Sequence, residues 1–142
     1  MEQLQWSDSL SIGVEIIDRQ HKTWIEHYNT LVSAVETRQG PREIAQTLGF
    51  LVDYTKFHFD AEEKQMADSG FPAMAEHQNQ HAELQTALGR LVDDFQEEGA
   101  THILADFLQT FLGAWLVDHI GSVDMEFGEH LREKGIELTE EE

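Results

Sequence analysis

Five histidines and two carboxylates have the residue types and the spacing of metal ligands. They are His21, His58, Glu62, His77, His81, His119 and Asp124. His77 and His81 are four residues apart and His58 and Glu62 repeat that interval, so each pair lies on one face of an α-helix. Imidazole nitrogen and carboxylate oxygen without sulfur suit iron, manganese, zinc or copper. The sequence therefore predicts a transition-metal site.

Each of these residues alone has a simpler explanation. A single histidine on an apolar helix face is usually a hydrogen-bonded core residue, and HxxxH or HxxxE pairs arise by chance on exposed helices. Here the polar residues interrupt the apolar stripe of every predicted helix, although burying one unpaired polar group costs about 2–7 kcal/mol. A structural zinc ion takes about four ligands. Because this set is too large for one ion, and carboxylates can bridge two, the sequence predicts a dinuclear site.

The residues that must position these ligands form four helical segments. Apolar side chains recur every three or four positions over about 17–38, 42–68, 73–97 and 101–128. Glycine and proline at 40–41 and 70–72, and glycine at 99, are helix terminators. No strand pattern occurs in the sequence. Long helices with short connections predict an all-α, up-down-up-down antiparallel four-helix bundle.

The rest of the chain is expected to lie outside the bundle. We expect residues 1–16 to form an extended N-terminal arm and 129–142 a C-terminal tail, all within one domain that spans 1–142.

The candidate ligands lie at compatible heights along antiparallel helices. His21 is early in the first segment, His58 is late in the second, the HQNQH pair is early in the third, and His119 is late in the fourth. One position needs a distortion, because His119 and Asp124 are five residues apart, ~140° on an ideal helix at ~100° per residue. We predict a local irregularity between residues 118 and 125, which Gly121 would permit.

Composition limits the possible partners. The 142-residue chain has 28 acidic and 9 basic side chains, with a formal net charge of −19 when histidine is neutral. This charge disfavours nucleic acid and anionic membrane surfaces. Cysteine is absent, which excludes disulfides, thiolate ligands and a cysteine nucleophile. With no signal-peptide pattern and no apolar run near ~20 residues, we expect a cytoplasmic protein without membrane insertion.

Four short motifs carry a resemblance to a known family. They are IDRQH with His21, HFDAEE with His58 and Glu62, HQNQH with His77 and His81, and HIGSVD with His119 and Asp124. In this order they resemble the hemerythrins, specifically the single-domain bacterial members, from Trp6 to about Phe127. The resemblance implies a non-haem di-iron centre with an oxo or hydroxo bridge that binds O2 reversibly.

The resemblance also implies a role for each ligand. His77, His81 and His119 hold one iron, His21 and His58 hold the other, and Glu62 and Asp124 bridge both. The second iron keeps an open position for O2, which we expect to face an apolar pocket. The candidate pocket residues are Trp24, Trp115, Leu116 and Ile120. The remaining histidines, His27, His102 and His130, are interpreted as surface residues.

The resemblance favours an O2 carrier or store over an enzyme. One alternative is an O2 sensor that signals to a separate protein, because no output domain is recognisable in this sequence. Another is a di-iron enzyme that turns over peroxide or nitric oxide, although no separate acid/base pair or substrate pocket is apparent. The protein partner and the metal, iron or manganese, stay open at this point.

Overall fold

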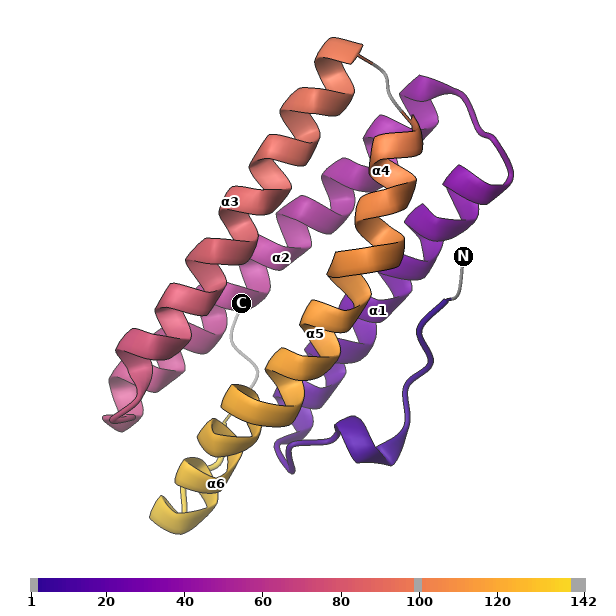
Figure 1. Ribbon diagram of the computed structural model, residues 1–142. Helices are drawn as coiled ribbons and strands as arrows, with labels where there is room; N and C mark the ends of the chain where they lie inside the picture. The colour runs from indigo at the N-terminus through magenta and orange to yellow at the C-terminus, as the bar shows by residue number, and fades with distance from the viewer. Residues whose placement is uncertain (1–2, 99–100, 139–142) are drawn as a thin grey trace.

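The computed structural model describes residues 3–98 and 101–138. Three long helices are α1 (Glu15–Glu36), α2 (Pro41–Ser69) and α3 (Met74–Glu98). A fourth rod consists of α4 (Thr101–Phe107), η2 (Leu108–Leu112), α5 (Gly113–His119), η3 (Ile120–Asp124) and α6 (Met125–Lys134). The four rods alternate in direction (Figure 1), and no strand occurs in the described ranges. The predicted all-α four-helix bundle is confirmed.

Proline and glycine set the limits of α2. Pro41 occupies its first turn, where a missing amide hydrogen costs nothing. Gly70 ends the helix in the left-handed region, with φ 67°, and the next amide, that of Phe71, donates to the Met66 carbonyl. Gly135 ends α6 in the same way, with φ 66°.

Both ends of the chain are more ordered than the sequence suggested. The expected tail at 129–142 is wrong for its first part, because α6 continues to Lys134 and buries Leu131; residues 139–142 lie outside the described part. The expected arm at 1–16 is not simply extended either. It contains η1 (Asp8–Leu10), it buries Ile12, and α1 already begins at Glu15. The apolar side chains of Ile12 and Leu131 explain both corrections, because each enters the core.

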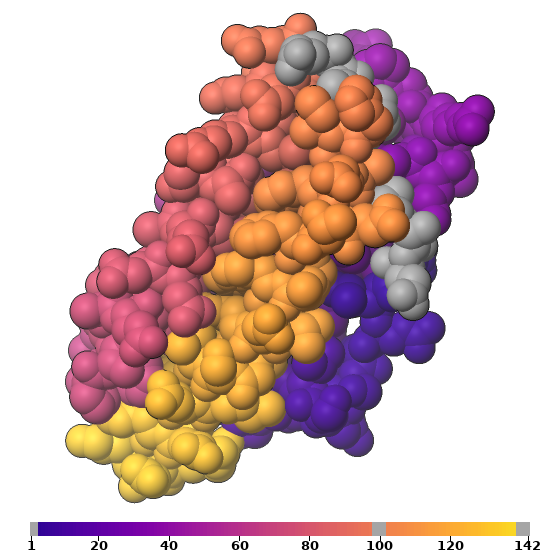
Figure 2. Space-filling view, viewed as in Figure 1, coloured from indigo at the N-terminus to yellow at the C-terminus, as the bar shows by residue number. Residues whose placement is uncertain are grey.

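The core fills the space between the rods and has two parts. Aliphatic side chains pack along most of the bundle, with Leu31, Leu51, Leu84 and Leu104 essentially inaccessible. The buried polar layer lies nearer the end where α2 meets α3. On the face that Figure 2 presents, side chains of α3 and of the fourth rod meet along one seam.

By length and composition, one helix, His102–Lys134, is apolar enough to cross a membrane. The expectation that no segment is long and apolar enough to cross a membrane is therefore wrong. However, the same helix delivers His119 and Asp124 to the bundle interior, and a core helix can pass the same test.

Candidate metal centre

The seven predicted ligands meet in one buried layer of the bundle. Each is at most 3% exposed. Their ligand atoms form two groups, each with all atoms within 4.8 Å of one another. One group comprises Glu62, His77, His81 and His119, and the other comprises His21, His58, Glu62 and Asp124. Because Glu62 belongs to both groups, the layer has the form of two adjacent sites with a shared carboxylate.

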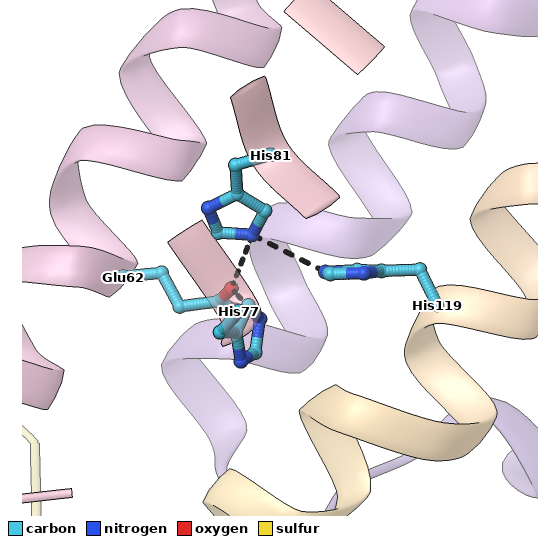
Figure 3. A group of neighbouring side chains, drawn as sticks. All are labelled: Glu62, His77, His81 and His119. Atoms are coloured by element: carbon cyan, nitrogen blue, oxygen red, sulfur yellow. Dashed lines mark hydrogen bonds and ion pairs between the residues drawn. The ribbon is translucent and has the colours of Figure 1, made fainter. Parts of the chain in front are cut away.

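Glu62 directs one oxygen toward each group. Its Oε1 lies 3.0 Å from His77 Nε2 and 3.2 Å from His81 Nε2. Its Oε2 lies 3.6 Å from His58 Nε2. Figure 3 shows Glu62 reaching from α2 toward the imidazoles of α3 and α5, where His81 Nε2 and His119 Nε2 are 3.2 Å apart.

Asp124 makes the same connection from the fourth rod. Its Oδ1 is 2.8 Å from His77 Nε2 and 3.4 Å from His119 Nε2. Its Oδ2 is 3.2 Å from His21 Nε2. Both carboxylates therefore lie between a three-histidine group and a two-histidine group, where each can bridge two cations.

The donor atoms fit metal ions better than they fit one another. Both carboxylate oxygens of Glu62 and Asp124, and both ring nitrogens of His21 and His77, are buried without a hydrogen-bond partner. They approach neighbouring donors closely, but without the directions of hydrogen bonds. Such orphaned groups are costly in an apolar core. Two bound cations would satisfy them, and imidazole with carboxylate suits a transition metal.

Three of the histidines form a hydrogen bond through Nδ1, their outer nitrogen, which points away from the centre of the layer. His58 Nδ1 is 2.7 Å from Gln20 Oε1, and His119 Nδ1 is 2.8 Å from Gln80 Oε1. His81 Nδ1 is 2.7 Å from a carboxylate oxygen of Glu63. In each pair Nδ1–H donates, which leaves Nε2 with a lone pair directed into the layer.

These three acceptors were not among the site residues predicted from the sequence. Gln20, Glu63 and Gln80 each adjoin a candidate ligand in the chain, and that proximity was the only signal available. Each acceptor supports a histidine on the next helix and not its own neighbour, so this signal would have assigned the wrong partner.

The clustered charges shift the pKa values of the metal-free layer. Burial opposes ionisation of Glu62, but the surrounding imidazoles hold its pKa down at about 2. The pKa of Asp124 also lies well below its ordinary value, because His119 and other imidazoles outweigh burial. Burial disfavours the charged form of His77, yet the two carboxylates close to its Nε2 raise its pKa to about 9. Burial dominates at His58 and lowers its pKa to about 4.

The fourth rod is distorted where the sequence predicted an irregularity. Ile120–Asp124 form a turn of π-helix, and the Met125 amide donates to the Ile120 carbonyl five residues earlier. This wider turn brings His119 and Asp124, five residues apart, to the same side of the rod. Glycine is not sterically required at position 121, because a Cβ added at Gly121 would meet nothing within 4 Å. A second π-helical turn at Leu108–Leu112 was not predicted.

The candidate pocket residues lie close to the layer in different ways. Leu116 and Ile120 are buried core residues, 3% and 0% exposed. Trp115 is half-buried, and its ring stacks on His119 with centroids 4.5 Å apart. Trp24 points into the core, where its Nε1 donates to Thr55 Oγ1 at 2.8 Å. Their role around a bound ligand stays a prediction.

The other histidines are only partly as expected. His102 is exposed. His27 and His130 were interpreted as surface residues but are half-buried. His27 packs against Tyr54, and the His130 ring donates to the Ser69 carbonyl at 3.0 Å. Aromatic neighbours and a free carbonyl at the end of α2 explain this burial.

A narrow crevice between α1 and α2 approaches the layer. Its walls include Ile17, Gln20 and Glu62, and Leu138 from the C-terminal segment lies along it. Its cavity volume is ≈ 20 Å³, room for about one water molecule. A group much larger than that does not fit in this crevice.

The bundle and its layer define a class of protein with a buried histidine/carboxylate site suited to metal ions. Residues 12–131 match the family model described as the hemerythrin HHE cation binding domain. The chain belongs to the hemerythrin family.

Individual relatives agree with this assignment. A bacteriohemerythrin of Stenotrophomonas maltophilia is 32% identical over 93% of this chain and 84% of its own. A myohemerythrin of Riftia pachyptila is 27% identical over 86% and 88%. A crystal structure of wild-type hemerythrin superposes with a TM-score of 0.76 at 28% identity, covering 92% of this chain and 98% of that one.

Proposed function

We propose that this chain is a reversible O2 carrier or store whose metals are two iron ions joined by an oxo or hydroxo bridge. The observation that carries the proposal is the pair of shared carboxylates, Glu62 and Asp124, each with one oxygen toward either histidine group. A di-iron centre supplies the two electrons that O2 takes up on binding. The protein then has to hold the metals, leave one position open and keep bulk water out.

The ligands divide unequally between the two metal positions. In this proposal His77, His81 and His119 hold one iron, His21 and His58 hold the other, and the two carboxylates bridge them. The position with fewer histidines would have room for a further ligand, and O2 would be taken up there. This division follows the two groups of close ligand atoms, in which three imidazoles face Glu62 from one side and two from the other.

The apolar residues beside the layer keep water and anions away from bound O2. Leu116 and Ile120 come from α5 and η3, on either side of His119, and both are buried. Trp24 lies one turn beyond His21 on α1. Low local polarity favours release of neutral O2 over loss of a charged, reduced product, because charge separation is costly in such surroundings.

The ligand set favours a carrier over an enzyme. Di-iron bundles of the ferritin-like kind place a carboxylate on every helix, whereas this layer has five histidines and two carboxylates. The relatives are named bacteriohemerythrin and myohemerythrin. We therefore propose O2 itself as the ligand.

Two measurements test the proposal. Metal analysis of the purified protein should give about two irons per chain. The reduced protein mixed with O2 in a stopped-flow instrument should form a long-lived coloured adduct that loses O2 under vacuum. Manganese or zinc in place of iron would contradict the metal assignment. Rapid decay of the adduct with repeated consumption of O2 would indicate an enzyme.

A further inference from the structure

Within residues 3–98 and 101–138, Glu63 is the one charged group that holds the outer nitrogen of a candidate ligand. Its Oε2 lies 2.7 Å from His81 Nδ1, and its Oε1 accepts a hydrogen bond from Gln78 Nε2 at 3.2 Å. Both carboxylate oxygens are therefore engaged. The side chain is 24% exposed, whereas His81 is almost completely buried. Glu63 thus reaches from the surface of α2 to fix a buried ring on α3.

The other four histidines of the layer are supported differently. His58 and His119 have neutral amide oxygens at Nδ1, from Gln20 and Gln80. The Nδ1 atoms of His21 and His77 have no hydrogen-bond partner within the described residues. Among the five imidazoles, His81 alone faces a carboxylate at its outer nitrogen. The support is therefore asymmetric, and the charge lies on the three-histidine side.

A second contact from the same helix restricts the His81 ring. Phe59, one turn before Glu63, stacks on the imidazole with centroids 3.7 Å apart and planes 3° apart. Phe59 holds the face of the ring, while Glu63 holds its edge. Rotation of the imidazole would break one contact or the other, so Nε2 points into the layer before any metal binds.

A carboxylate at Nδ1 changes a histidine as a ligand. It accepts a charge-assisted hydrogen bond, roughly twice as strong as one to a neutral amide. The imidazole becomes a more basic donor through its other nitrogen, which stabilises a more highly charged metal ion. An amide oxygen orients the ring with much less of this electronic effect.

We propose that Glu63 is a positioning residue that acts through His81 to stabilise the oxidised state of the metal held by the three-histidine group. The inference rests on the proposed di-iron function, and it assigns different roles to the two irons. The iron of His77, His81 and His119 is the better electron donor. The iron of His21 and His58, supported by neutral Gln20, is the O2-binding position.

The experiment compares two charge changes of opposite sign at one metal position. Glu63→Gln keeps an oxygen acceptor and nearly the same shape but removes the charge. Gln80→Glu adds a carboxylate at His119, a ligand of the same group. The midpoint potential of the iron-loaded protein is measured by spectroelectrochemical titration. We expect Glu63→Gln to favour the reduced state about tenfold, about 59 mV upward for one electron, and Gln80→Glu to shift the potential downward.

A second readout is independent of iron and O2. Co²⁺ titration of the metal-free variants, followed by visible absorption, should show binding weakened about tenfold by Glu63→Gln. Gln85→Ala, an exposed change on α3, is the control for general effects on the helix. If iron content or O2 binding fails while the Co²⁺ effect persists, the proposed function is wrong and the role of Glu63 stands.

The inference is overturned if Glu63→Gln leaves both the potential and the Co²⁺ affinity at the parent values. It is also overturned if both charge changes move the potential in the same direction, because a purely structural disturbance would do so. Should Glu63→Gln fold poorly, the shift in Gln80→Glu decides by itself, since a downward shift is what the added charge predicts.

Discussion

Gln20 and His58 lie on adjacent helices, and Gln20 Oε1 accepts a hydrogen bond from His58 Nδ1 at 2.7 Å. The residue after Gln20, His21, contributes to the same layer from α1. The arrangement recurs around the bundle: Glu63 of α2 supports His81 of α3, and Gln80 of α3 supports His119 of α5. Each of α1, α2 and α3 therefore carries a ligand of its own and the support for a ligand on the next helix, whereas Nδ1 of His21 has no such support within the described residues.

Removal of Gln20 tests this arrangement. Gln20→Ala should weaken metal binding 10–100-fold, as losses of outer-nitrogen partners typically do, because the His58 ring can then rotate. Competition for Co²⁺ with a chelator of known affinity measures the effect. Gln46→Ala, an exposed change on α2, should leave the affinity unchanged. Equal affinities for the Gln20 variant and the parent would show that packing alone holds His58.

Metal removal should destabilise the bundle. The orphaned atoms of Glu62, Asp124, His21 and His77 are satisfied only by bound ions, so the metal-free protein loses several kcal/mol of stability, of the order of 2–7 per unpaired group before relaxation. Chelation under reducing conditions, followed by thermal unfolding monitored by circular dichroism, should give a clearly lower Tm. A Tm that does not change would mean that these side chains satisfy one another.

Metal binding should release protons near neutral pH. In the metal-free protein the pKa of His77 is raised to about 9, so the ring is protonated at pH 7, and a metal at Nε2 must displace that proton. Zn²⁺ binding should therefore tighten as pH rises from about 7 to about 9. Proton release in a weakly buffered titration with an indicator dye measures the displacement. A release that is the same at pH 7 and pH 10 would contradict it.

The raised pKa of His77 also makes the metal-free fold less stable as the pH rises. Because the folded pKa of His77 is raised above the ordinary histidine value of 6.5, its ion pairing contributes fully to stability below that value. This contribution is lost as pH rises through about 9. The metal-free protein should accordingly unfold at a lower denaturant concentration at pH 10 than at pH 6. The His77→Gln variant should lose this pH dependence.

Leu116 tests the apolar surroundings of the open position. Leu116→Asn should leave the iron content near two per chain but admit water beside His119. Autoxidation of the O2 adduct should then proceed several-fold faster. Leu116→Met is the matched control, because it keeps the volume and the apolar character. Adduct lifetimes at equal pH and chloride decide, and equal lifetimes for the asparagine variant would remove Leu116 from the O2 pocket.

The buried polar layer could be predicted from the sequence because each of its residues is polar at a position where the helical pattern calls for an apolar side chain. His58 and Glu62 occupy positions in an otherwise apolar stripe, and such exceptions are visible without coordinates. The residues that hold the outer histidine nitrogens give no such signal, because a polar residue next to the apolar stripe of a helix is ordinary. They are Gln20, Glu63 and Gln80. Which histidine each one reaches depends on the rotation of one helix against the next, and residue spacing does not determine that rotation.

The predictions for the two ends of the chain were wrong for a related reason. Leu131 follows Glu129 and His130 and precedes a charged run, so the sequence there resembles a solvated tail. The helix around Leu131 is joined to Ile12 through Arg132 and Gly128. Ile12 lies more than a hundred residues earlier, and no local pattern reports such a contact. The irregularity at Ile120–Asp124 was predictable because two ligands at an impossible spacing required it. No pair of candidate ligands requires the π-helical turn at Leu108–Leu112, so no sequence signal predicted it.

Contacts between Ile12 in the N-terminal segment and α6 join parts of the chain that are far apart in sequence, and this bears on when the metal layer can be assembled. Arg132 donates to the Ile12 carbonyl across 120 positions of sequence, and Gly128 lies against the same carbonyl, where a Cβ would be 2.4 Å away. The Ile12 amide in turn donates to Asp18 at the start of α1, three residues before His21. Asp124, Gly128 and Arg132 follow all the other candidate ligands in the chain. A nascent chain that stops before Asp124 therefore holds an incomplete ligand set.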